Sequence, residues 1–148
     1  MNFKGTVKIN APREKVWRFL TDPTQLSDCA PGLEKLEIIK PNEQFRATAS
    51  VGFGAVKATF VIDATWMGLD PPNRAKMKIH GKAPGSGVEG TSEMVLHDGD
   101  KPGVTILDWS SDVTVVGAIA SLAARLMGPV TQKLTDAFFE NVRKKIEG

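Results

Sequence analysis

Cysteine is nearly absent from this sequence, because Cys29 is the only one among 148 residues. A single cysteine cannot form a disulfide within the chain, and it cannot supply the several thiolates of a structural zinc site. The two histidines, His80 and His97, are spaced neither as metal ligands nor as members of a catalytic triad. We therefore expect no catalytic residues and no metal ligands, and we interpret Cys29 as a small buried hydrophobic side chain rather than a nucleophile.

Net charge and long apolar runs are also scarce. The net charge of +2 does not suit a nucleic-acid-binding surface, since a phosphate backbone requires a concentrated basic face. No segment approaches the roughly 20 consecutive apolar residues of a membrane-spanning helix. The N-terminal segment also lacks the apolar region of a signal peptide. The sequence predicts a cytoplasmic protein with a single domain over residues 1–148.

What the sequence does contain is a long amphipathic segment from Gly117 to Gly148. Its apolar residues recur at the spacing of one helix face, which predicts a helix that must be covered by a sheet or a pocket. Gly128-Pro129 interrupts this segment. Because proline lacks an N–H group and collides with the preceding turn, the helix is expected either to kink or to restart there. The covered face is predicted to consist of Ile119, Leu122, Ala123, Leu126, Val130, Leu134, Ala137 and Phe138.

A second apolar stripe, formed by Phe139, Val142 and Ile146, falls on the opposite face of the same helix. Two explanations stay open. The first strand or helix of the chain could cover the stripe. Alternatively, the stripe could dock on an acidic partner or on anionic lipid headgroups, with neighbouring basic residues contributing to the contact. These basic residues are Arg143, Lys144 and Lys145.

Alternating apolar and polar residues predict seven strands before this helix. The first covers residues 2–10 and is followed by a short helix, which begins at Ala11-Pro12 and ends at Asp22-Pro23, and by one further helical turn. Short turns rich in Gly, Pro, Asn and Asp separate the other strands, as is typical of an antiparallel meander. The fold class is therefore α+β, with a seven-stranded antiparallel sheet wrapped around the long C-terminal helix. The six later strands are expected near 33–40, 43–51, 56–69, 74–82, 88–97 and 103–116.

The sheet face that should meet the helix carries many small residues, among them Ala47, Ala58, Ala64, Gly81 and Ser92. Protein interiors are densely packed, so either the helix lies very close to the sheet or a cavity remains between them. If a cavity remains, replacing Ala58 or Ala64 with leucine should fill it. The residues expected to line it and bind a ligand are Trp17, Leu20, Phe60, Ile62, Met77, Ile79, Met94, Trp109, Leu122, Leu126, Val130 and Leu134.

The glycine-rich stretch from Gly81 to Gly90 contains the pattern G-x-G-x-x-G. A dinucleotide site requires a helix directly after this pattern, whereas strand residues follow here. We therefore do not interpret it as a nucleotide site. It is expected to be either an ordinary glycine-rich turn or a hairpin loop beside the mouth of the cavity.

Several short motifs extend along nearly the whole chain. Together with the order of the elements, they resemble those of the CoxG family of carbon monoxide dehydrogenase subunits, within the START-like (Bet v 1-like, SRPBCC) superfamily of helix-grip folds. The matching residues are Ala11-Pro12, Val16-Trp17, Leu20, Asp22-Pro23, Leu26, Cys29-Ala30-Pro31-Gly32, Gly54-Ala55-Val56-Lys57-Ala58, Asp70-Pro71-Pro72, Gly81-Lys82, Gly85, Gly90, Gly117, Leu122, Arg125-Leu126, Lys133-Leu134 and Phe138-Phe139.

The resemblance implies a non-catalytic accessory protein of a molybdenum-containing CO dehydrogenase or a related oxidoreductase. It implies an apolar cavity that binds an isoprenoid quinone or a lipid, without a covalent cofactor, and peripheral contact with the inner face of the membrane. Some relatives carry a hydrophobic C-terminal extension, whereas this chain stops at Gly148, so permanent anchoring is not expected.

Two other interpretations of the function stay open. One is a START-like enzyme, such as a polyketide cyclase or hydrolase. That interpretation is disfavoured because Ser92, Ser111 and Cys29 are the only small polar groups expected to point inward. The other is a pure assembly or membrane-recruitment factor that binds no ligand.

Overall fold

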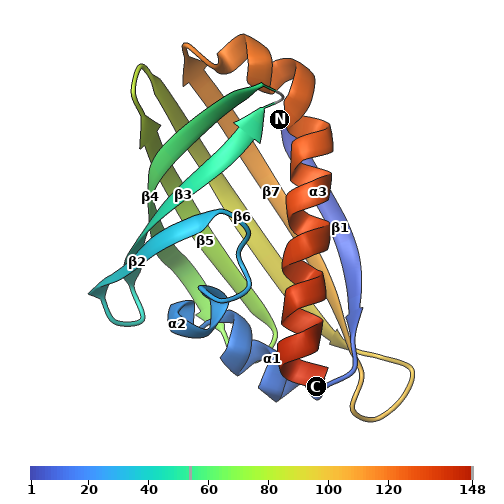
Figure 1. Ribbon diagram of the computed structural model, residues 1–148. Helices are drawn as coiled ribbons and strands as arrows, with labels where there is room; N and C mark the ends of the chain where they lie inside the picture. Colours follow the sequence, from blue (N-terminus) through green and yellow to red (C-terminus); the bar gives the residue numbers. More distant parts are fainter. Residues whose placement is uncertain (54, 148) are drawn as a thin grey trace.

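A computed structural model describes residues 1–53 and 55–147, so Gly54 and Gly148 of the motifs above lie outside the described residues. It contains one seven-stranded sheet with the strand order β1-β7-β6-β5-β4-β3-β2, and every neighbouring pair is antiparallel. Figure 1 shows the sheet curving around one long helix, as predicted. The elements are β1 (Asn2–Ile9), α1 (Arg13–Leu20), α2 (Pro23–Leu26), β2 (Leu33–Lys40), β3 (Gln44–Phe53), β4 (Val56–Asp70), β5 (Arg74–Ala83), β6 (Ser86–Asp98), β7 (Thr105–Gly117) and α3 (Ala120–Glu147).

The two faces of the sheet differ as the alternation predicts. Phe60, Ala64 and Leu107 belong to the face expected to meet the helix, and all three are buried. Lys57 and Lys78 belong to the other face, and both are exposed. Many other residues on the inner face are only half-buried, which indicates that α3 does not fill the whole concave side of the sheet.

The long helix passes through Gly128-Pro129 as one element. Its orange first turns lie at an angle to its red remainder (Figure 1). Of the two predicted alternatives, the structure therefore excludes a restart at Pro129, because the helix is continuous there. The absence of an N–H group on proline, together with the clash of its ring with the preceding turn, is the usual cause of such a bend.

The two residues that precede α3 are attached to the β5–β6 hairpin. Ala118 N–H donates to Gly85 O at 2.9 Å, and Ile119 N–H donates to Ser86 Oγ at 3.2 Å. Gly117, which joins β7 to the helix, has a φ of 93°, and a Cβ atom there would lie 2.2 Å from Gly85 O. Only glycine permits this close approach and this backbone conformation together. The hairpin therefore determines where the helix begins.

The C-terminal half of α3 is attached to β1 and to the two short helices. Phe139, Val142 and Ile146 are 8%, 0% and 5% exposed and belong to the same buried core cluster as Ile9 and Val16. Polar contacts reinforce this packing: Lys15 Nζ donates to Ile146 O at 2.9 Å, Asn141 Nδ2 to Cys29 O at 3.0 Å, and Arg143 Nε to Lys8 O at 3.1 Å. The hypothesis that this apolar stripe docks on an outside partner is wrong, because the chain itself covers the stripe.

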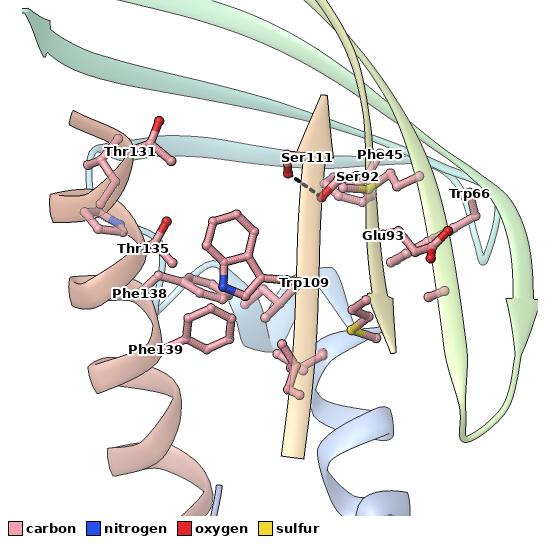
Figure 2. Close-up of a pocket in the computed structure, with 18 residues that line it drawn as sticks. Phe45, Trp66, Ser92, Glu93, Trp109, Ser111, Thr131, Thr135, Phe138 and Phe139 are labelled. Carbon is pink, nitrogen blue, oxygen red and sulfur yellow. Dashed lines mark hydrogen bonds between the residues drawn. The ribbon is translucent and has the colours of Figure 1, made fainter. Parts of the chain in front are cut away.

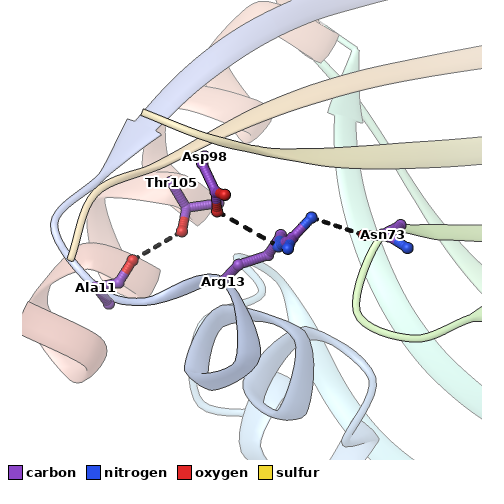
Figure 3. A network of polar contacts seen from close by, with 5 residues as sticks. All are labelled: Ala11, Arg13, Asn73, Asp98 and Thr105. Carbon is purple, nitrogen blue, oxygen red and sulfur yellow. Dashed lines mark hydrogen bonds and ion pairs between the residues drawn. The ribbon is translucent and has the colours of Figure 1, made fainter. Parts of the chain in front are cut away.

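A polar network holds α1 against the end of the sheet (Figure 3). Thr105, which is 0% exposed, donates from Oγ1 to Ala11 O at 2.7 Å and so joins the start of β7 to the corner between β1 and α1. Arg13 then reaches from α1 to two other elements. Its Nη1 donates to Asn73 Oδ1 at 2.7 Å, and its Nε lies 3.5 Å from Asp98 Oδ1. The corner that supports the end of α3 is therefore fixed by one buried hydrogen bond and one arginine.

We expect Thr105→Val to lower the free energy of unfolding by about 1–3 kcal/mol. The valine keeps the shape of the side chain, but it leaves the buried Ala11 carbonyl without its donor. Chemical denaturation measures the effect. Thr114→Val is the matched control, because Thr114 is exposed on the same strand and its replacement should change stability by less than about 0.5 kcal/mol. Equal stability of the two variants would contradict this role of the Thr105 hydroxyl.

Candidate functional site: a cavity between the sheet and α3

A cavity of about 380 Å³ lies between the concave face of the sheet, the second half of α3 and the two short helices. Figure 2 shows the lining side chains of α3 facing those of the strands across this space. Its volume falls in the range of small-molecule sites, roughly 300–1,000 Å³. The lining residues are Leu20, Leu26, Pro31, Phe45, Trp66, Ala75, Met77, Ser92, Glu93, Met94, Leu107, Trp109, Ser111, Thr131, Leu134, Thr135, Phe138 and Phe139.

The position of the Trp109 indole helps to keep this space open. Trp109 on β7 pairs with Gly5 on β1, and a Cβ atom at Gly5 would lie 2.7 Å from Trp109 Nε1. The ring therefore lies against the backbone of β1, in room that any other residue at position 5 would occupy. Small inward residues on neighbouring strands, such as Ala75 and Ser92, leave further room opposite α3.

Two aromatic pairs stand on different sides of the cavity. Phe138 and Phe139 on α3 meet edge to face, with ring centroids 5.1 Å apart. Phe45 on β3 and Trp66 on β4 form a tilted pair with centroids 6.4 Å apart. The second pair also lines a separate depression of about 310 Å³ between α2 and the β2–β3 turn. Phe45 and Trp66 therefore separate the apolar cavity from a more polar groove at the surface.

The polar groups of the cavity are few and consist mainly of hydroxyls. Ser92 on β6 and Ser111 on β7 are paired in register, and their Oγ atoms are 2.9 Å apart. Thr131 and Thr135 lie one helical turn apart on α3. Glu93 is the one charged side chain among the described lining residues, and its carboxylate accepts from Arg74 Nη2 at 2.7 Å. Because successive strand side chains point to opposite faces, this carboxylate points away from Ser92 and the cavity.

Five of the twelve predicted ligand-binding residues line this cavity: Leu20, Met77, Met94, Trp109 and Leu134. Their binding of a ligand, like that of the other seven, stays a prediction. Trp17 is a residue of α1 and is buried in the core cluster, and Phe60 is buried outside the lining. The remaining five are also absent from the lining, and they are Ile62, Ile79, Leu122, Leu126 and Val130.

The predicted and observed linings differ because the free space lies beneath the second half of α3, and not along the earlier part of the helix. The sequence analysis expected lining residues from Leu122 to Leu134 of the helix. It left open whether the segment from Gly81 to Gly90 is an ordinary glycine-rich turn or a loop beside the mouth of the cavity, and the structure favours the ordinary turn. No residue of this segment lines the cavity, because the segment forms the β5–β6 hairpin that holds the start of α3. Ala58 and Ala64 likewise do not line the cavity. The G-x-G-x-x-G pattern runs into β6 and not into a helix, as expected.

The sequence analysis missed several lining residues, and only some of them could have been identified from the sequence pattern. Phe45, Trp66, Ser92, Leu107 and Ser111 all occur at inward positions of their strands, so the alternation pattern already marked them. Thr131 and Thr135 carried no such signal, since polar residues on a helix are normally assigned to its exposed face. Phe139 was assigned to the wrong face because both sides of α3 are covered in its C-terminal half.

The two histidines and the cysteine lie outside the cavity lining. His80 Nδ1 contacts Glu89, and His97 Nε2 lies 3.0 Å from Asp108 Oδ2, with both imidazoles about half exposed. Burial raises the pKa of the Cys29 thiol above its ordinary value, which makes it a poorer nucleophile. This confirms the interpretation of Cys29 as a buried apolar residue. Among residues 1–53 and 55–147, no group of three or more His, Cys, Asp or Glu could hold a metal ion.

Comparison with known protein families identifies the family to which the chain belongs. The sequence profile of the CoxG family of carbon monoxide dehydrogenase subunits matches residues 5–147. The chain belongs to the CoxG family. No curated protein matches it at a significant level. No helix among the described residues is both long and apolar enough to cross a membrane.

Solved structures show the same helix-grip fold. A conserved protein from Geobacillus kaustophilus is 26% identical, with a TM-score of 0.90 over 99% of this chain and 95% of its own. The Zhui aromatase/cyclase from Streptomyces sp. R1128 is 20% identical, with a TM-score of 0.76 over 99% and 93%. A START superfamily protein from Mycobacterium smegmatis is 13% identical, with a TM-score of 0.72 over 99% and 97%. The CoxG chain therefore has the START-like architecture that its motifs indicated.

We expect Gly5→Ala to reduce the capacity of the cavity. The new methyl group displaces the Trp109 indole into the free space, and overpacking of this kind costs about 1–3 kcal/mol. The dissociation constant of the neutral fluorescent probe N-phenyl-1-naphthylamine should rise roughly tenfold, which corresponds to about 1.4 kcal/mol. Gly68→Ala is the matched control, since no atom lies within 4 Å of a Cβ at that strand position. Unchanged probe binding in Gly5→Ala would show that the indole does not limit the cavity.

Proposed function

We propose that this CoxG-family protein is a non-catalytic carrier that binds an isoprenoid quinone or another apolar lipid in the cavity beneath α3. The observation that carries the proposal is the composition of the cavity wall. Thirteen of its eighteen residues are Leu, Pro, Phe, Trp, Ala or Met. A wall of this kind favours a ligand with a large apolar surface, because transfer of apolar surface out of water is the main source of binding free energy.

Catalysis at this site is poorly supported, and the same wall supplies the reason. General acid–base chemistry requires a titratable group within hydrogen-bond reach of the substrate. The described lining residues offer serine and threonine hydroxyls, and the carboxylate of Glu93 is paired with Arg74. The aromatase/cyclase among the solved structures shares the fold with this chain at 20% identity. A shared fold at that identity does not carry an activity with it.

We further propose that the partner is a molybdenum-containing CO dehydrogenase or a related oxidoreductase. The support is membership of the family that is named for a subunit of carbon monoxide dehydrogenase. An apolar carrier suits such a partner, since a water-insoluble electron acceptor must be shielded from water on its way to a redox enzyme. Peripheral contact with the membrane, where such a ligand resides, belongs to the same proposal.

Two buried alanines provide a sharp test of the carrier proposal. Ala75 and Ala64 are both 2% exposed, but only Ala75 lines the cavity. Ala75→Leu should fill empty space, so we expect a change in stability below about 1 kcal/mol and a large loss of bound ligand. Ala64→Leu meets packed neighbours, so we expect a loss of stability of about 1–3 kcal/mol with bound ligand retained in the folded fraction.

Mass spectrometry of an organic extract from each purified protein measures the bound ligand, and thermal melting measures stability. A quinone or lipid that co-purifies with the native protein and with Ala64→Leu, but not with Ala75→Leu, is the expected result. A native protein that carries no ligand and takes up no added quinone would contradict the carrier function. It would leave a pure assembly or recruitment factor as the better description.

A further inference from the structure

The two serines on the sheet side of the cavity are the unusual feature of its wall. Ser92 and Ser111 occupy directly opposed positions on β6 and β7, and both are half-buried. Their immediate inward neighbours along the two strands are Met94 and Trp109, which are apolar. Hydroxyls in an apolar wall lose hydrogen bonds to water, and this cost is recovered only when they find other partners. The two hydroxyls meet part of this need by bonding to each other and to Ser110 O, and a polar group on a ligand can supply a further partner.

The arrangement of protons within the pair determines what that group can be. Ser92 Oγ lies 2.9 Å from Ser111 Oγ and 3.4 Å from Ser110 O. If the Ser92 hydroxyl donates to Ser111 over the shorter distance, the Ser111 proton remains available. A hydroxyl rotates freely enough to aim that proton into the cavity. The pair can thus donate one hydrogen bond to an acceptor on a ligand.

The rest of the wall restricts the acceptor to a neutral one. A bound carboxylate or phosphate needs a cation or several donors to offset the loss of its hydration. The described lining residues include no lysine, arginine or histidine, and their one charged side chain is the acidic Glu93. Thr131 and Thr135 on α3 add hydroxyls across the cavity, where Figure 2 shows them on the helix that faces the strand of Ser111. A neutral carbonyl oxygen fits this set of groups.

We propose that Ser92 and Ser111 form a carbonyl-binding clasp, in which Ser111 donates to a ketone or quinone oxygen of the ligand and Ser92 orients the Ser111 hydroxyl. This inference rests on the carrier function proposed above, and it makes the pair the determinant of specificity within that cavity. Apolar contacts supply most of the affinity, and the clasp selects ligands that bear a carbonyl group over hydrocarbons of the same shape.

A pair of ligands that differ only in their carbonyl groups tests the clasp. Duroquinone (tetramethyl-1,4-benzoquinone) and durene (1,2,4,5-tetramethylbenzene) share one ring and four methyl groups, and both are small enough for the cavity. Duroquinone has no free ring position, so it cannot add to Cys29. Equilibrium dialysis measures the dissociation constant of each ligand for the native protein, Ser111→Ala, Ser92→Ala and the double variant. Ser110→Ala is the matched control, because Ser110 adjoins Ser111 on β7 and has the opposite strand parity.

We expect Ser111→Ala and the double variant to bind duroquinone roughly three- to tenfold more weakly, the range of one net hydrogen bond. Durene binding should be unchanged or slightly tighter, and Ser110→Ala should alter neither ligand. Infrared spectroscopy adds a readout that a purely structural role would not move. The carbonyl stretch of bound duroquinone should lie at a lower frequency in the native protein than in Ser111→Ala.

The possible failures are distinguishable. If durene and duroquinone weaken equally in the serine variants, the pair acts only through packing and the clasp is overturned. If duroquinone binding and its carbonyl frequency are the same in all variants, the clasp is likewise overturned, while the carrier function stands. If the native protein binds neither ligand, the carrier proposal fails and the clasp fails with it. Single serine variants keep the test decisive if the double variant does not fold.

Discussion

The cavity depends on the attachment of α3 at both of its ends. At its start, the backbone of residues 118 and 119 is hydrogen-bonded to the β5–β6 hairpin. At its other end, Val142 and Ile146 are buried in the core cluster with β1 and α1. A helix held at two points spans the space between them whether or not that space is filled. Collapse of the helix onto the sheet, which would otherwise remove a cavity, is resisted by these attachments.

The buried core lies at the end of the molecule where β1, α1 and the C-terminal part of α3 meet. The core cluster gathers residues of β1, α1, β6, β7 and α3 at this end, and the buried hydrogen bond from Thr105 to Ala11 O fixes the corner beneath them. A binding cavity costs contacts that a filled core would make. The core contacts are concentrated at one end of the cavity, where Leu20, Leu107 and Phe139 belong both to the core cluster and to the cavity wall. This arrangement lets a protein of 148 residues hold an apolar space and remain folded.

Much of this architecture could be predicted from the sequence, because it depends on local periodicity. The period of two residues defined all seven strands and their inward faces, and the period of 3.6 residues defined α3. The continuation of α3 through Pro129 was not predicted uniquely, since proline weakens a helix locally but tertiary contacts decide whether it continues. Phe139 was misplaced for the same kind of reason. A helical wheel describes one covered face, whereas this part of α3 is covered on two.

The position of the cavity could not be predicted, and two alanines show why. Ala64 and Ala75 are equally buried and occupy inward positions of neighbouring strands, yet only Ala75 borders the free space. A small residue creates room only where the opposing element is held at a distance, and that distance is set by contacts elsewhere in the chain. The sequence therefore reveals which side chains point inward, but not how far away the opposite wall stands. The same holds for the polar groups. A serine pair on neighbouring strands becomes a candidate for ligand binding only where the facing helix leaves space between helix and sheet.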